Sequence, residues 1–297
     1  LMYTELLSEN KLAAVIQSLL KIIFITFLIE AIGALLIYFS ISQQAIPTAN
    51  GKVFFAVFHA VSSFCNAGFS ILPDGLYHSS IRFNYLFQLI IALLFIVGGL
   101  GFGIVLNAYQ FVKRWLRNFY LIIRFERPFV YRAWVISFNS RLVIWTTFGL
   151  LFIGTLGIFA LEFNRSLAEH KGFWAKLAGA FFMGSSPRTA GFNAIDMSLL
   201  SLPAVIFIML LMWIGASPGS TGGGIKTSTF AVAIMNFISL AKGKDRVEAF
   251  GREIGMDSVR RSSSIIFLSI LGLGLTIFGL SITDSNQNLL LLAFESV

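Results

Sequence analysis

Long, uninterrupted apolar runs constrain this chain more than any other feature of its sequence. Four of them occupy residues 12–41, 83–112, 133–162 and 260–282. A helix needs about 20 residues to cross the hydrocarbon core of a bilayer, and each run is long enough. A fifth apolar stretch, 202–240, is interrupted at 215–227. With only 12% of its residues charged, roughly half the share in soluble domains, the chain is predicted to be an all-α membrane protein with five crossings.

Basic residues concentrate in two of the connections between these runs. Residues 113–132 and residues 242–261 each contain six lysines and arginines. Such connections stay on the cytoplasmic side of a membrane, so both segments and Leu1 are predicted to be cytoplasmic. The net charge of +8 is therefore interpreted as a topology signal, and we expect no nucleic-acid partner. Both ends have the composition of cut segments, and we expect the chain to be part of a longer one.

Two further apolar segments are too short to cross. They are residues 54–64 and 174–186, and about 11 helical residues reach only ~16 Å, near half of the hydrocarbon core. Each lies between the outward ends of two predicted crossing helices. Each must then enter from outside and return to the same side, which predicts two re-entrant hairpins.

The two hairpins belong to an internal repeat. Residues of the same type recur 123 positions apart, pairing Phe58, Ser62, Ser63, Ala67, Gly68 and Phe69 with Phe181, Ser185, Ser186, Ala190, Gly191 and Phe192. The same separation relates Gly99 to Gly222 and Gly101 to Gly224. A unit of helix, hairpin and helix crosses twice, so the repeats are parallel and surround one axis along the membrane normal. A third copy begins at residue 260, and the arrangement predicts a central ion pore.

An irregular segment follows each short helix: CNAGFS at 65–70 and RTAGFN at 188–193. Irregular backbone inside a bilayer is tolerated where it lines a watery cavity. Glycine lets carbonyl groups turn inward, and carbonyl rings replace the hydration shell of a monovalent cation. The sequence therefore predicts a selectivity filter for K⁺, or a close relative, whose ion-binding residues are Cys65, Asn66, Ala67, Gly68, Thr189, Ala190 and Gly191.

The interruption at 215–227 has three possible interpretations. A phosphate-binding loop needs G-x-x-x-x-G-K-[ST] after a strand, but Ile225 stands at the lysine position and Lys226 comes one residue late. A simple packing kink needs only one or two proline or glycine residues. We favour a movable loop beneath the filter that obstructs the pore. Its gate residues are Gly215, Ser217, Gly219, Ser220, Thr221, Gly222, Gly223, Gly224 and Lys226.

Ionisable residues inside membrane segments are candidates for function. Glu30 is the clearest, with a structural pair as its alternative role, and Arg188 beside the second filter segment is expected to be a structural anchor. The three histidines are dispersed and form no metal-ligand pattern. No catalytic set of side chains stands out, so we expect neither an enzyme nor a cofactor, only the transported ion.

The motifs FHAVSSFCNAGF, SSPRTAGFN and GASPGSTGGGIKTST together resemble the Trk/Ktr/HKT superfamily of K⁺ transporters, most of all the membrane subunit of Ktr systems. The resemblance implies four helix–pore-helix–helix units around one pore. It makes residues 1–117 the second unit, 118–245 the third, and 246–297 the start of the fourth. Gly68 and Gly191 match the filter glycines of the superfamily, and 215–227 matches its gating loop. Cys65 replaces a more usual serine or asparagine.

The resemblance also implies a function and partners. The expected function is channel-like potassium uptake across the plasma (inner) membrane, by a multi-pass homodimer that binds a cytosolic nucleotide-binding regulatory subunit and membrane lipids. Two alternatives stay open. One is Na⁺ or coupled K⁺/Na⁺ transport by the same fold, and the other is a solute carrier with broken helices, which parallel repeats disfavour.

Overall fold

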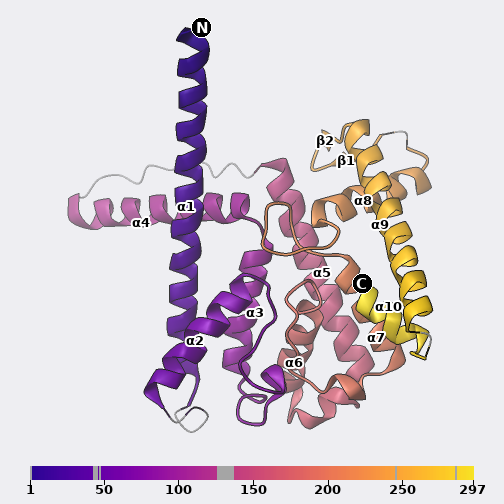
Figure 1. Cartoon of the computed structure of the whole chain (residues 1–297). Coiled ribbons are helices and arrows are strands. Elements are labelled where there is room, and N and C mark those ends of the chain that lie inside the picture. The colour runs from indigo at the N-terminus through magenta and orange to yellow at the C-terminus, as the bar shows by residue number, and fades with distance from the viewer. Residues whose placement is uncertain (1, 43–45, 47, 126–136, 245, 285) are drawn as a thin grey trace.

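A computed structural model of the chain describes residues 2–42, 46, 48–125, 137–244, 246–284 and 286–297 (Figure 1). Leu1 and the 126–132 part of the basic segment 113–132 lie outside the described residues. The helices are α1 (Met2–Ser40), α2 (Ala49–Phe64), α3 (Tyr85–Gly99), α4 (Phe102–Phe125), α5 (Phe138–Glu162), α6 (Phe173–Ser185), α7 (Leu202–Trp213), α8 (Thr227–Ala241), α9 (Met256–Thr283) and α10 (Leu289–Ser296). Three short 3-10 helices are η1 (Gly75–Tyr77), η2 (Ser166–Glu169) and η3 (Met197–Leu199).

Three of these helices are long and apolar enough to cross a membrane without a break. They are α1 from Val15, α5, and α9. None of the most apolar window of α9 is buried within the chain, as expected of a helix whose sides face lipid. The predicted crossings at 12–41 and 260–282 are confirmed, as is the described part of 133–162.

The prediction of one continuous helix over residues 83–112 is wrong. The chain breaks at Leu100 and Gly101, and α3 and α4 meet at an angle of 108°. Gly101 has φ +89°, a conformation that glycine adopts without steric cost, and this turns the chain out of the helix direction. The fifth stretch is broken as predicted, because α7 and α8 are separated by residues 214–226.

The two short apolar segments lie in helices α2 and α6, of 16 and 13 residues. At 1.5 Å per residue they reach about 24 and 20 Å, short of the hydrocarbon core of about 30 Å, so both stay candidate pore helices. Thr48 caps α2 by accepting a hydrogen bond from the backbone N–H of Gly51 at 3.3 Å. Helix α6 packs closely on α5, since a Cβ added to Gly184 would come within 2.4 Å of the carbonyl carbon of Gly154. Small residues thus let the pore helix lie directly against the backbone of its crossing helix.

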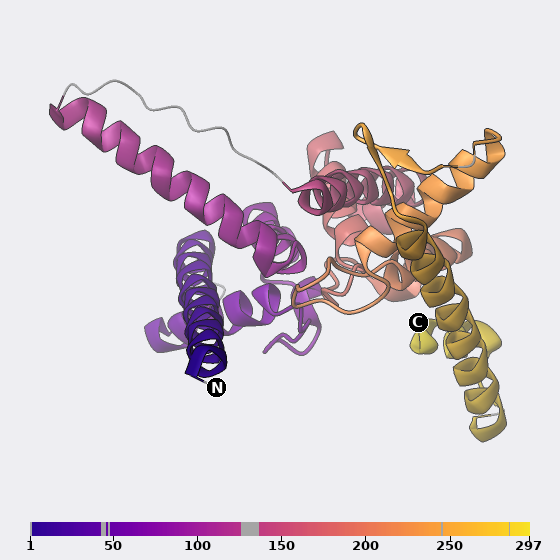
Figure 2. The same ribbon diagram turned by 90° about the horizontal axis from the view of Figure 1, so that it is seen from above.

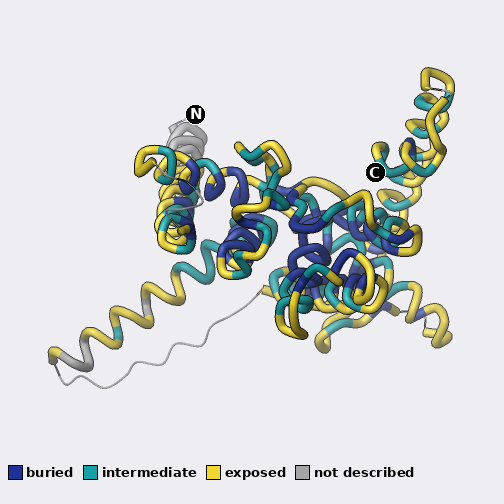
Figure 3. The backbone as a smooth tube through the Cα atoms, turned by 90° about the horizontal axis from the view of Figure 1, so that it is seen from below, coloured by how far each residue is buried: buried dark blue, intermediate teal, exposed yellow. Residues whose placement is uncertain are grey.

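The buried core lies where the two repeat units meet. Phe95 of α3 and Phe182 of α6 come from different units and make an edge-on ring contact at 5.9 Å between centroids. Figure 3 shows the buried backbone concentrated in this central region, while α4 is mostly exposed. Among the described residues the only strands are β1 (Glu248–Ala249) and β2 (Arg252–Glu253). They form a small antiparallel hairpin inside the basic segment 242–261.

Candidate functional site

The two predicted filter segments share an unusual backbone conformation. Positive φ angles occur at Asn66 (52°) and Gly68 (73°), and again at Thr189 (76°) and Gly191 (76°). Both pairs are related by the 123-residue repeat. Positive φ costs little for glycine and is tolerated by asparagine, but it is strained for a β-branched threonine. Such strain persists only where the surroundings impose it, which is typical of functional sites.

The two segments meet backbone to backbone. A Cβ added to Gly68 would lie 2.8 Å from the carbonyl oxygen of Ala190 and 2.9 Å from the Cα of Gly191. A side chain at Gly68 therefore has no room. The repeats converge on one point, as the parallel arrangement predicts.

Serine side chains tie each segment to the end of its own pore helix. The Ser62 hydroxyl donates to the carbonyl of Phe69 at 2.8 Å, and the Ser186 hydroxyl donates to the carbonyl of Phe192. His59 is fully buried and also links the first pore helix to the segment 65–70. One of its ring nitrogens lies 2.9 Å from the carbonyl oxygen of Phe55 and the other lies 2.9 Å from the Ser70 hydroxyl.

His59 was not predicted as part of the site. Its signal in the sequence is weak, because the repeat places Phe182 at the equivalent position, so the histidine belongs to the first unit alone. Glu30 also reaches the first filter segment, and Cys65 donates to its carboxylate over an S···O distance of 3.8 Å. Glu30 is 8% exposed, and the contact links α1 to the first filter residue.

The loop 214–226, which separates α7 from α8, is a compact hydrogen-bonded structure. The N–H of Ala216 donates to the carbonyl of Gly223 at 3.0 Å. Lys226 donates through Nζ to the carbonyl oxygens of Gly222 at 2.8 Å and Gly223 at 3.4 Å. A Cβ at Gly215 would lie 2.0 Å from the Gly223 oxygen. Glycine at these positions therefore allows the loop to fold onto itself.

This loop docks on the break between α3 and α4. The backbone N–H groups of Ser217 and Thr221 donate to the carbonyls of Gly99 at 3.0 Å and Gly98 at 3.3 Å. In return the N–H of Phe102 donates to the carbonyl of Gly219 at 2.8 Å. Backbone groups at helix ends lack hydrogen-bond partners within their own helix. Here the loop of the second unit supplies partners to the helix ends of the first unit.

The loop also contacts both filter segments. The Thr221 hydroxyl donates to the carbonyl of Phe64 at 2.9 Å and accepts from the Asn66 amide at 2.7 Å. Arg188 donates through Nη2 to the carbonyl of Gly215 at 3.3 Å. This contact fits the anchoring role expected of Arg188, whose side chain is buried at 8% exposure. Of the predicted gate residues, Gly215, Ser217, Gly219 and Thr221 thus make contacts outside the loop.

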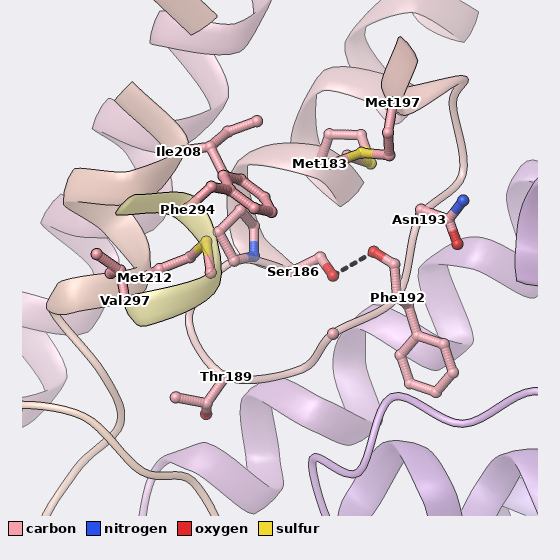
Figure 4. A pocket seen from close by; sticks show the side chains of 12 residues that line it. Met183, Ser186, Thr189, Phe192, Asn193, Met197, Ile208, Met212, Phe294 and Val297 are labelled. Carbon is pink, nitrogen blue, oxygen red and sulfur yellow. Dashed lines mark hydrogen bonds between the residues drawn. The ribbon is translucent and has the colours of Figure 1, made fainter. Parts of the chain in front are cut away.

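A cavity of about 440 Å³ lies beside the second filter segment (Figure 4). Thr189, Gly191 and Asn193 border it on one side, and Ile208 and Met212 of α7 border it on another. Helix α10, in the third repeat copy, contributes Phe294, and Val297 follows the end of this helix. The cavity thus lies between the segment 188–193 and the helices α7 and α10.

A polar cluster joins the two units at the end of the molecule predicted to face outward. Tyr77 donates to both carboxylate oxygens of Glu169 at 3.0 and 3.1 Å, and Arg82 forms an ion pair with Glu169 at 3.3 Å. Burial raises the pKa of Tyr77, and the hydrogen bond to Glu169 raises it further. The hydroxyl oxygen of Tyr85 lies 2.9 Å from Nδ1 of His170, and burial lowers the pKa of that histidine. The pairs lie far apart in sequence, and no local pattern predicted them.

The described residues contain no group of three or more metal-binding side chains. The two candidate filter segments present carbonyl groups and small side chains at the ends of the short helices α2 and α6. This combination defines a class of membrane protein in which parallel pore-helix units surround an ion path.

The chain belongs to the TrkH family. The sequence profile of this family, described as a cation transport protein, matches residues 1–297. The resemblance seen in the filter and loop motifs is thereby confirmed.

Relatives and a solved structure agree with the family. The chain is 34% identical over 287 residues, or 95% of its length, to the potassium/sodium uptake protein NtpJ of Enterococcus hirae. It is 32% identical over 94% of its length to Ktr system potassium uptake protein B of Bacillus subtilis. It covers 57% and 58% of those two proteins, so it spans less than two thirds of their length.

The crystal structure of the potassium transporter TrkH from Vibrio parahaemolyticus has the same fold. It superposes with a TM-score of 0.58 at 18% identity, over 84% of this chain and 50% of that chain. The predicted fold class, an all-α membrane protein with pore-helix repeats and a broken helix, is confirmed.

Proposed function

We propose that this chain forms part of a channel-like transporter for potassium uptake across the plasma membrane. The main support is that two segments with positive φ at the same repeat-related positions meet backbone to backbone at Gly68 and Gly191. Two half-length helices, α2 and α6, lead into them. The names of its relatives, which include potassium and potassium/sodium uptake proteins, support the choice of cation.

In this proposal the carbonyls of Cys65–Gly68 and Thr189–Gly191 replace water around a dehydrated K⁺ ion. The ion is the cargo and needs no side-chain ligand, because rings of carbonyl oxygens match the coordination of a monovalent cation. The C-terminal ends of α2 and α6 add partial negative charge toward the same point. Units 1–117, 118–245 and the start of a further unit at 246–297 arrange these segments around the path.

The loop 214–226 is the proposed gate. Its hydrogen bonds to Gly98, Gly99 and Phe102 hold it at the α3–α4 break, and Thr221 connects it to the first filter segment. The Thr221 hydroxyl and the Arg188 side chain add further bonds. A loop held by a small number of hydrogen bonds, of which a neutral one contributes about 1 kcal/mol net, can be displaced by modest forces. Selectivity then belongs to the filter and flow control to the loop.

The relatives named as parts of a Ktr system support a protein that works with partners. We propose a homodimer that binds a cytosolic nucleotide-binding regulatory subunit on the face carrying 113–132 and 242–261. Basic residues on that face are also suited to anionic lipid.

The test is ion uptake by a full-length parent containing this chain, reconstituted into vesicles. Rb⁺ uptake is measured with K⁺ or Na⁺ as competitor. The proposal expects K⁺ to suppress Rb⁺ uptake at concentrations where Na⁺ does not. Equal suppression would favour the Na⁺ or coupled alternative, and uptake of an organic solute without cation flux would favour a carrier.

A further inference from the structure

Helix α4 is a basic amphipathic helix. Its polar and apolar side chains separate onto opposite faces more strongly than in any other described helix. Helical spacing puts Lys113 and Arg117 on one face, and Val112, Trp115 and Phe119 on the other. The last three side chains are 49–51% exposed. A helix of this composition is typical of the boundary between headgroups and acyl chains.

The orientation of α4 fits that location. It turns by 108° from α3 and runs across α1 in Figure 1, while in Figure 2, where α1 is seen nearly end-on, α4 extends lengthwise beside it. Since α1 crosses the bilayer, a helix that runs across it lies along the membrane plane. The predicted topology places this level at the cytoplasmic side, where anionic lipids give the surface a negative potential.

A groove of about 370 Å³ lies between α1 and α4. Its apolar wall includes Leu20 and Phe24 of α1 and Leu106 of α4, while Lys21 and Lys113 contribute ammonium groups from the two helices. Neither lysine forms an ion pair with an acidic side chain among the described residues. The groove therefore combines an apolar wall with two positive charges that no acidic side chain of the described residues neutralises.

We propose that this groove binds an anionic phospholipid of the cytoplasmic leaflet. One acyl chain lies against Leu20, Phe24 and Leu106, and the phosphate lies between Lys21 and Lys113. Lysine can extend its charged end toward the headgroup level while its methylenes remain on apolar surface. A zwitterionic lipid matches the apolar wall equally well but offers no net charge to the two ammonium groups. The inference uses the proposed orientation of the chain and does not depend on which cation is transported.

Native mass spectrometry of the full-length parent in a neutral detergent tests the site. Phosphatidylglycerol and phosphatidylcholine with identical acyl chains are added, and retained lipid is counted. Each basic residue near a membrane surface contributes about 1 kcal/mol, so Lys21→Gln and Lys113→Gln are each expected to weaken phosphatidylglycerol retention about fivefold. Phosphatidylcholine retention should stay unchanged. Lys171→Gln, at an exposed lysine outside both basic segments and away from the groove, is the matched control.

A second variant tests the apolar wall. Leu106→Trp fills the groove and keeps both lysines, so lipid retention should fall while surface charge is constant. The proposal is overturned if the lysine variants retain phosphatidylglycerol as the parent does, if Lys171→Gln weakens retention equally, or if Leu106→Trp has no effect. Retention does not require ion flow, so failure here leaves the transport proposal standing, and a change of transported cation leaves the lipid site standing.

Discussion

The two repeat units break their second helices at equivalent positions but in different ways. The first unit breaks over Leu100 and Gly101 alone, whereas the second opens the 13-residue loop between α7 and α8. Gly101 and Gly224, related by the repeat, both have positive φ, at 89° and 68°. The glycine turn is thus common to both units, and the added loop is particular to the second.

The difference has a consequence for how the units are joined. The short break leaves helix-end groups of α3 and α4 without partners of their own, and the long loop of the other unit supplies them. A Cβ at Gly101 would lie 2.6 Å from the carbonyl oxygen of Pro218, so the contact is close as well as polar. The loop of the second unit is thus attached to the unit that carries the first candidate filter segment.

The largest effect is expected from a variant that distorts the filter and leaves the interruptions of the second helices intact. Gly191→Ser forces a side chain onto a backbone at φ +76° that already touches Gly68. A left-handed conformation costs an ordinary residue about 1–2 kcal/mol, and the added atoms disturb the carbonyls. We expect the preference for K⁺ over Na⁺ in vesicle uptake to fall about tenfold or more.

The control for this variant is Gly149→Ala in α5, where an added Cβ meets no atom within 4 Å. It should keep both uptake and preference. A Gly191→Ser protein that folds and retains its full K⁺ preference would remove this position from the filter.

A smaller effect is expected from loosening the loop. Thr221→Val keeps the shape of the side chain but removes its bonds to Phe64 and Asn66. Losing buried hydrogen bonds costs about 1–3 kcal/mol, so Rb⁺ uptake should rise several-fold with selectivity largely kept. Ser220→Ala removes a bond to Ser217 within the loop and serves as the comparison. If both variants raise uptake equally, attachment to the other unit is not what restrains the loop.

The smallest effect concerns the outer cluster, which joins the units far from either break. Burial lowers the pKa of His170, with Glu169 opposing this shift and Arg82 and Lys176 adding to it. The folded protein therefore keeps the ring neutral to a lower pH than the unfolded chain, which takes up a proton near pH 6.5. Stability from this site is present above about pH 6.5 and is lost as the pH falls below it.

Thermal unfolding of the full-length parent in detergent measures this loss. The Tm should drop by a few degrees between about pH 7.5 and pH 5, and His170→Gln should reduce the drop. An identical pH dependence in the variant would assign the effect to other groups.

The sequence predicted those parts of the molecule that depend on local spacing. The half-length helices α2 and α6, the loop before Thr227 and the 123-residue repeat all follow from apolar runs and glycine positions. The break at Gly101 was missed because glycines in an apolar run, here Gly98, Gly99, Gly101 and Gly103, are compatible with a continuous membrane helix.

Contacts between distant segments could not be predicted in this way. The bonds from Thr221 to Phe64 and Asn66 span 157 and 155 residues. The pairing of Tyr77 with Glu169 spans 92. They depend on how the units pack, which one sequence does not encode in any local pattern. The repeat indicated that the units converge, but not that the loop of one unit would complete the helix ends of the other.

The central claim is that the docked loop restrains ion flow beneath an independent filter. The most direct measurement is Rb⁺ uptake per folded molecule in a full-length parent whose Gly219–Gly224 segment is shortened, with Lys226→Ala as a milder variant that removes the bonds to Gly222 and Gly223. The account predicts that uptake rises in both, more in the shortened protein, while K⁺ preference stays nearly unchanged. A fall in uptake per molecule with the fold intact would contradict it.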